Sequence, residues 1–427
     1  MSKFSSWKKA GTAIVATLMT VGMLGACGSS SSSGTKVTIF NSKVEIESQM
    51  EDMAKKYSKE KGVDVEVYYS NDTVAAHLAT KYASKDPYTI SMVDAKDIYS
   101  LAEEHAVDLS DQDWVKDTDY AISINGKTYG FPVSIEARGL IYNADAIKKV
   151  TGKEFKPENY KTLDEFKDLI DELKAGGMKS PTGVMKEDWS LAGHLLPEVY
   201  EEQEDPDAFC HELKDGKVDL SSNAKWNSLM DFFDVMKDNN YAKSSAISAE
   251  REVTEQKLAE GEIAFMFGGN WDWSVLNQYD YTENMGLMPV PQNTDDGSNE
   301  KLVGGGSKYF FIDSSDNTSD EQRKAAKDFL NWLAEDKEGQ EFISKDAALI
   351  SPFKNNEIEA SDPLGKSVKS YADAGKLIGN YNYLPDDHFS VLGAAFQKWL
   401  AGEEDRAGLA QDIQDYWKTA KFTGATA

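Results

Sequence analysis

The chain has 427 residues, among which 73 acidic residues outnumber 46 basic ones, so that its formal net charge at pH 7 is -27. Such an acidic composition disfavours nucleic acid as a partner, because no basic stripe could neutralise the phosphates. The length exceeds that of one ordinary domain and suggests two.

The first 26 residues have the pattern of a secretory signal peptide. Residues 1–9 carry three lysines and no acid, and residues 10–26 are uncharged and apolar, as in a segment that is removed on export. The letters "LGAC" then end at Cys27 and resemble the lipobox of bacterial lipoproteins, in which the cysteine becomes the lipidated first residue. The alternative is an uncleaved membrane anchor, which needs a span of about 20 residues. Residues 27–35 would form a Ser/Gly-rich flexible tether.

A strand, a helix and a second strand follow the tether. The segment "KVTIF" (36–40) alternates like a strand, and apolar residues recur at helical spacing from Ile46 to Tyr57. The segment "KGVDVEVYY" (61–69) then returns as a strand. This order predicts a βαβ unit.

Two later helices carry clear start signals. The helix in "TLDEFKDLIDELKAGG" opens with a capping box from Thr162 to Glu165 and stops at Gly176, and another opens with Ser319 and Gln322. Helices of this kind between strand patterns predict α/β domains with parallel or mixed sheets.

Neither a metal nor a cofactor is expected. The five histidines are scattered without ligand spacing, and Cys27 and Cys210 form no CxxC pair. The glycine run "VGGGSKYFF" (303–311) lacks the spacing of a phosphate-binding loop, and it indicates instead a close backbone approach at a hinge.

Four blocks in chain order carry a family resemblance. They are "FPVSIEARGLIYNADAIKK" (131–149), "EGEIAFMFGGNWDWSVL" (260–276), "MPVPQ" (288–292) with "LVGGGSKYFFI" (302–312), and "DFLNWLAEDKEGQEFISKDAALISP" (328–352). Together they resemble the maltose-binding-protein-like, family 1 extracellular solute-binding proteins over nearly the whole mature chain. The resemblance implies a monomeric substrate-binding lipoprotein, anchored at the extracellular face of the cell membrane, that delivers an oligosaccharide to the permease subunits of an ABC importer.

The resemblance also implies the fold. It predicts a two-lobed, periplasmic-binding-protein-like α/β fold with a hinge that the chain crosses more than once and a ligand cleft between the lobes. Lobe 1 would take residues 36–136 and 303–348, and lobe 2 would take residues 137–302 and 349–421. Closure of such lobes buries a ligand and presents a new surface to the transporter.

Two tryptophans in "FGGNWDWSVL" (267–276) suggest how a sugar would be held. A sugar ring has apolar C–H faces and a polar rim, so its sites combine flat aromatic rings with carboxylates and amides. The resemblance gives the stacking role to Trp271, with Trp273 packed behind it, and a second platform to Trp189. For all three tryptophans, packing in the core is the alternative.

The polar contacts of the expected site follow from the same resemblance. Glu136 matches the family's hinge glutamate, which accepts hydroxyl hydrogen bonds, and a structural salt bridge is its alternative. Asn41 and Lys43 lie in the first strand-to-helix loop, which faces the crevice in such folds unless it is merely solvated.

Two further segments would complete the cleft. Asp94 and Lys96 occupy another such loop, although Met92 stands where the family has an aromatic residue. Near the C-terminus, "NYLPDDHFSVLGAAFQKWLAG" (382–402) resembles the family's last cleft segment, which implies contacts at Asp387 and Phe389. An N-cap role for Asp386 or Asp387 is the alternative.

Two other classes of function remain open from the sequence. A cell-surface glycoside hydrolase would use a similar cleft with two carboxylates about the scissile bond, but no motif singles out such a pair, so we expect no enzyme. A binding protein for a polyamine or a peptide is the other alternative. Among sugars, the resemblance favours malto-oligosaccharides.

Overall fold

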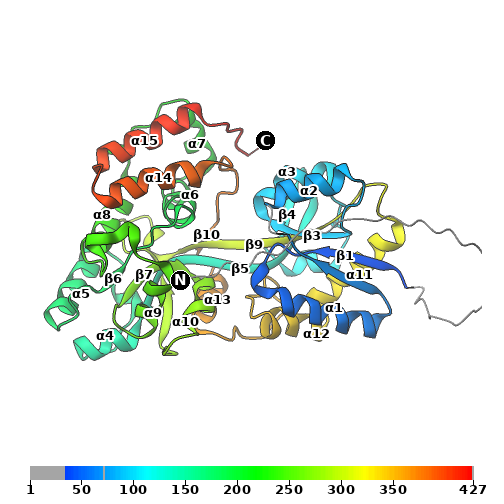
Figure 1. Ribbon diagram of the computed structural model, residues 1–427, viewed down its shortest axis with the longest axis horizontal. Coiled ribbons are helices and arrows are strands. Elements are labelled where there is room, and N and C mark those ends of the chain that lie inside the picture. Colours follow the sequence, from blue (N-terminus) through cyan, green and yellow to red (C-terminus); the bar gives the residue numbers. More distant parts are fainter. Residues whose placement is uncertain (1–33, 71–72, 426–427) are drawn as a thin grey trace, which may run out of the picture. The chain divides into compact units, whose positions relative to one another are not determined.

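The computed structural model describes residues 34–70 and 73–425, so the predicted signal peptide and Cys27 lie outside the described residues. In the described chain the strands form one ten-stranded mixed sheet in the order β2-β1-β3-β9-β5-β7-β6, with β10 paired to β9 and both β4 and β8 paired to β5. Helices cover this sheet as two lobes, and the long strands β5 (Lys127–Asn143) and β9 (Leu302–Ile312) run through both (Figure 1).

The first lobe is built from the N-terminal elements and from two helices that follow β9. Its strands and helices are β1 (Lys36–Phe40), α1 (Glu47–Lys61), β2 (Asp64–Tyr68), α2 (Val74–Ala83), β3 (Ile90–Asp94), α3 (Ala95–His105), β4 (Ile122–Ile124), α11 (Asp320–Glu335) and α12 (Lys337–Glu341).

Alternating side chains of the first lobe's strands enter two different cores. Ile39 and Phe310 pack in one cluster with α1 and α11, whereas Phe40, Val93 and Phe311 pack in a second cluster with α2 and α3. Because neighbouring residues of a strand point to opposite faces, the sheet is buried on both sides.

The second lobe holds most of the remaining helices. Its elements are α4 (Ala144–Thr151), α5 (Leu163–Ala175), β6 (Thr182–Gly183), α6 (Pro197–Glu201), α7 (Pro206–Lys214), α8 (Ala224–Asp238), α9 (Arg251–Ala259), β7 (Phe265–Gly269), α10 (Trp273–Leu276), β8 (Met285–Met288), α13 (Pro363–Asp373), β10 (Leu377–Ile378), α14 (His388–Ala401) and α15 (Arg406–Thr419).

The same alternation builds the core of the second lobe. Leu140 and Phe265 face a cluster with α5, α8, α14 and α15, whereas Ile141 and Met266 face a cluster with α9 and α13. Cys210 is buried in the larger of the two clusters and is a free thiol.

The glycine run in β9 allows it to lie close against β5 between the lobes. Gly304 pairs with Ala137 in the antiparallel register of the two strands, and a Cβ atom at Gly304 would overlap the backbone carbonyl of Glu136. The predicted close backbone approach is thus present at this point, and it fixes the backbone that carries Glu136.

The local predictions agree with the structure. Strands β1 and β2 are parallel neighbours on either side of α1 in the chain, which confirms the βαβ unit. The capping boxes of α5 and α11 form at Thr162 and Ser319. The α/β, two-lobed fold class is also confirmed, whereas the exact bounds of the lobes stay a prediction.

Within residues 34–70 and 73–425, no helix has both the length and the apolar character that crossing a membrane requires.

Candidate functional site

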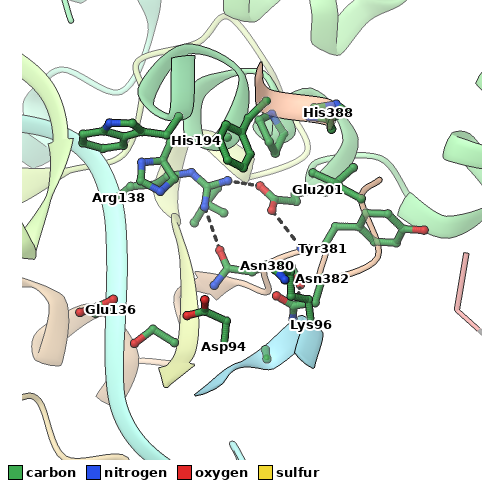
Figure 2. A pocket seen from close by; sticks show the side chains of 18 of the residues that line it. Asp94, Lys96, Glu136, Arg138, His194, Glu201, Asn380, Tyr381, Asn382 and His388 are labelled. Carbon is green, nitrogen blue, oxygen red and sulfur yellow. Dashed lines mark hydrogen bonds and ion pairs between the residues drawn. The ribbon is translucent and has the colours of Figure 1, made fainter. Parts of the chain in front are cut away.

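A cavity of about 370 Å³ lies where β5 and β9 pass between the lobes. Figure 2 shows Asp94, Lys96 and Glu136 toward one side of it and His194 and His388 toward the other, with Arg138 between them. Its volume lies near the lower end of the ~300–1,000 Å³ range of small-molecule sites. Since Trp271 is part of its lining, we call it the Trp271 cavity.

The turn after β7 brings Trp271 to the cavity, and two glycines make this turn possible. Asp272 accepts a hydrogen bond of 2.9 Å from the Gly269 N–H, which closes the turn Asn270–Asp272. A Cβ atom at Gly268 would overlap the Asp272 carboxylate, and one at Gly269 would overlap the Trp271 ring. The letters "GGNWD" therefore encode a tight turn that folds the indole back over the end of the strand.

A widened helical turn, Trp189–Leu195, supplies two further rings. Its hydrogen bonding is π-helical, a geometry that occurs often at functional sites. The His194 ring lies 4.7 Å from the Trp271 ring and 5.4 Å from the Trp189 ring, measured between centroids. Burial, together with the positive charges of Arg138 and Arg251, lowers the pKa of His194 well below its ordinary value, so the ring is neutral at pH 7.

Arg251 supports both tryptophans from behind. Its guanidinium carbon lies 4.4 Å from the centre of the Trp189 ring, a cation–π contact. The same guanidinium pairs with the Asp272 carboxylate that closes the Trp271 turn, and its Nε donates to Glu255 over 3.1 Å. One arginine on α9 thus connects the two aromatic platforms.

Two carboxylates on the other side of the cavity already have cationic partners. Glu136 pairs with the Lys43 Nζ atom at 2.9 Å, and Asp94 pairs with the Lys308 Nζ atom at 2.5 Å. Burial alone would lower the pKa of Lys43, but the nearby carboxylates, with Glu136 first, raise it above its ordinary value. These carboxylates keep further oxygen lone pairs for a ligand's hydroxyl groups.

Lys96 lies at the start of α3, beside the cavity. Its ammonium group donates to the buried Asp97 carboxylate over 2.8 Å. Burial raises the pKa of Asp97 in spite of this partner.

A buried ion pair closes the cavity toward the second lobe. Arg138, which is 5% exposed, pairs with Glu201 and donates to the Asn380 side chain over 2.8 Å. A second carboxylate, that of Glu198, lies 3.7 Å from the Arg138 Nε atom. Burial raises the pKa of Glu201, and it raises the pKa of Glu198 well above its ordinary value.

The structure brings six of the predicted site residues to the Trp271 cavity. They are Asp94, Lys96, Glu136, Trp189, Trp271 and Phe389. Whether they bind a ligand stays a prediction, but their common location agrees with it.

Three predicted site residues lie outside the cavity lining. Asn41 is buried, and its side chain exchanges hydrogen bonds of 2.9 Å with the backbone of Lys43, so it shapes the loop that presents this lysine. Lys43 stands behind Glu136 as its ion-pair partner. Asp387 accepts a hydrogen bond of 2.7 Å from Tyr416, and the preceding Asp386 lines the cavity instead.

Sequence reasoning missed several residues of the lining. Arg138 stands two residues after Glu136 in a recognised block, and this spacing along a strand places both side chains on one face. His194 follows Trp189 in the same turn, but no pattern in the sequence indicates that its ring contacts Trp271. Glu201 and Asn380 come from segments without a motif, and Asn382 opens the segment 382–402, in which the sequence pointed only to Asp387 and Phe389.

The described residues contain no group of three His, Cys, Asp or Glu side chains arranged to hold a metal ion. The cavity instead combines aromatic rings, among them those of Trp189, Trp271 and Phe389, with carboxylates, amides and a guanidinium group. Such a lining is suited to a neutral ligand that has flat apolar faces and many hydroxyl groups.

Comparisons with known proteins place this geometry in context. Residues 52–374 match the family model described as bacterial extracellular solute-binding protein. The fold resembles the apo form of RafE from Streptococcus pneumoniae, with a TM-score of 0.73 and 17% identity, over 90% of this chain and 98% of that one.

Two further structures share the fold. A family 1 extracellular solute-binding protein from Bifidobacterium longum subsp. infantis has a TM-score of 0.65 and 24% identity, over 90% of this chain and 99% of that one. A sugar transporter from Bacillus licheniformis, solved in complex with stachyose, has a TM-score of 0.64 and 19% identity with the same coverage.

Proposed function

Because this chain belongs to the family of bacterial extracellular solute-binding proteins, we propose that it is the substrate-binding lipoprotein of an ABC importer and captures an oligosaccharide in the Trp271 cavity. The observation that carries the proposal is the pairing of an aromatic wall, with Trp189, His194 and Trp271, and an opposing set of carboxylates that includes Glu136 and Asp94. Rings can cover the C–H faces of a sugar while the carboxylates accept hydrogen bonds from its hydroxyls.

Ion pairs at three of the cavity's carboxylates disfavour a polyamine as the ligand. Glu136, Asp94 and Glu201 each have a cationic partner within the protein. A polyamine would need carboxylates that are free to compensate its ammonium groups, whereas sugar hydroxyls need only unused lone pairs. The paired state of these acids therefore favours a neutral ligand.

The same contacts disfavour glycoside hydrolysis. A hydrolase needs a protonated carboxyl group that donates to the leaving oxygen, beside a second carboxylate. Burial raises the pKa of Glu201, but its two oxygens accept hydrogen bonds from Arg138 and from the Tyr381 N–H. This carboxyl group is thus oriented as an acceptor within the protein.

Similar folds hold several oligosaccharides. Solved structures of the same fold contain raffinose, stachyose or mannobiose, which supports this ligand class for the chain without choosing one member. The sequence blocks favour malto-oligosaccharides, and a panel of glycans decides among them.

Calorimetric titration of the mature protein with malto-oligosaccharides, raffinose-family sugars, manno-oligosaccharides, spermidine and a mixed tripeptide tests the proposal. We expect saturable binding of a glycan with a Kd on the order of micromolar, about -8 kcal/mol. Chromatography of the same mixtures should show no product. Release of shorter sugars, or saturable binding of spermidine or peptide alone, would contradict the proposal.

Membrane attachment through Cys27 is a separate expectation. Replacing Cys27 with Ala removes the thiol that would carry the lipid, while the rest of the "LGAC" segment stays intact. We expect the variant to lose metabolic labelling by a fatty-acid analogue and to leave the membrane fraction. A Ser29→Ala variant is the matched control, because it lies in the tether and keeps the thiol. Unchanged labelling of the Cys27→Ala protein would refute lipidation at this residue.

A further inference from the structure

A second cavity, of about 440 Å³, lies beside the Trp271 cavity. Lys96, Asn382, Leu384, Pro385 and Asp386 line both cavities. A single short segment of chain, residues 382–386, therefore separates the two spaces. We call the second space the Tyr383 cavity after the aromatic residue of this segment that lines it.

The partition is fixed to the second lobe at its start. The Asn380 side chain accepts a hydrogen bond of 2.8 Å from Arg138, and the Tyr381 N–H donates to Glu201 over 2.9 Å. The Tyr381 hydroxyl also donates to Asp207. Contacts with the second lobe therefore hold the start of the segment that lies between the two cavities.

Tyr383 reaches from this partition to the first lobe. Its ring lies 4.7 Å from the Tyr99 ring of α3, measured between centroids, at an interplanar angle of 45°. The Tyr383 cavity is thus bounded on one side by α3 and on the other by the partition. Like the Trp271 cavity, it lies between elements of the two lobes.

The lining of the Tyr383 cavity repeats the chemistry of the first. It combines the aromatic residues Tyr99 and Tyr383 with the polar side chains of Lys96, Ser100 and Asp386. Aromatic rings next to hydroxyl, ammonium and carboxylate groups suit a polyhydroxylated ligand. Lys96 and Asp386 line both spaces, so groups able to bind hydroxyls are present where the two cavities adjoin.

We propose that the Tyr383 cavity extends the ligand site and takes the outer units of an oligosaccharide whose first units fill the Trp271 cavity. The inference rests on the proposed function. It predicts a preference for longer chains, because the Tyr99 and Tyr383 rings add contacts that a disaccharide in the Trp271 cavity cannot reach.

Calorimetry with one series of glycans of equal linkage, from disaccharide to pentasaccharide, tests this proposal. The series is chosen from the class that the wild-type protein binds best. We expect the affinity of the wild-type protein to rise at least tenfold along the series. Tyr383→Ala and Tyr99→Ala should each remove most of this gain while changing disaccharide affinity less than about twofold, since a well-placed aromatic anchor contributes on this scale.

Two further variants guard against a general effect on folding. Ser100→Arg adds a long side chain on the exposed surface of α3 and should block the longer glycans while sparing the disaccharide. Tyr281→Ala removes a half-exposed tyrosine that lines neither cavity and should leave the whole series unchanged.

The outcomes separate the two proposals. Disaccharide binding without any gain along the series, or equal losses at every length in the tyrosine variants, overturns the extended site and leaves the proposed function standing. Absence of binding by every glycan in the wild-type protein overturns both.

Discussion

Trp271→Ala should weaken binding of the preferred oligosaccharide by about 2–3 kcal/mol, the scale of an aromatic hot spot, and should leave the ligand-free protein folded. The reason is the position of the indole. It lies in the turn Asn270–Asp272, next to the His194 ring and on the lining of the cavity. We therefore expect the ligand to complete its stacking surface. Calorimetric affinity and the urea midpoint of the apo protein measure the two effects.

Trp273 provides a matched control two residues away. Its ring packs on the cluster that includes Leu276 and stands edge-on to Tyr281, with centroids 4.9 Å apart, and it does not line the cavity. Trp273→Ala should lower the free energy of unfolding by about 2–3 kcal/mol, somewhat less than a fully buried tryptophan, with little change in affinity. Normal binding with early unfolding in Trp271→Ala would show that this residue, too, serves packing.

Arg138→Met should lower the free energy of unfolding by about 3–5 kcal/mol, the cost of leaving buried charges unpaired. The substitution keeps much of the side-chain volume but removes the cation between Glu201 and Glu198. A second substitution, Glu201→Gln in the same protein, should recover part of the loss because it removes one of the orphaned carboxylates. Denaturant unfolding of the single and double variants measures both steps.

The loss in free energy of unfolding caused by Arg138→Met should increase as the pH rises. Burial already raises the pKa of Glu201 above its ordinary value of 4.5, and Arg138 opposes this shift. Without the arginine, the pKa of Glu201 in the folded protein lies further above the pKa of the same group in the unfolded chain. The free energy of unfolding therefore falls as the pH rises above the pKa that Glu201 has in the unfolded chain. The denaturant midpoint of Arg138→Met should therefore fall more than that of the wild type between about pH 5 and about pH 8. An equal or smaller fall would contradict this explanation.

The parts of the fold that the sequence predicts are those with local causes. The capping boxes at Thr162 and Ser319 depend on side chains three residues apart, and the βαβ unit follows from a change in hydrophobic period within residues 36–69. The sheet order is different, because β9 joins β3 and β5 from far along the chain. Such pairings leave no local pattern to read.

The candidate site divides in the same way. Trp271 and Glu136 lie in blocks with a family pattern, and the structure places both on one cavity. The pair between Arg138 and Glu201 joins residues 63 positions apart, so neither partner indicates the other in the sequence. Asp387 shows that the sequence did not place the contact to the exact residue. Of the two neighbouring aspartates before α14, Asp386 lines the cavity, whereas Asp387 accepts a hydrogen bond from Tyr416.

A crystal structure of the mature protein with its tightest-binding glycan tests the central claim most directly. The account predicts a sugar ring against the Trp271 indole, hydroxyl groups within hydrogen-bonding distance of Glu136 or Asp94, and an intact glycosidic bond. A ligand bound outside the Trp271 cavity, or one that leaves both the indole and these carboxylates without contact, would contradict it.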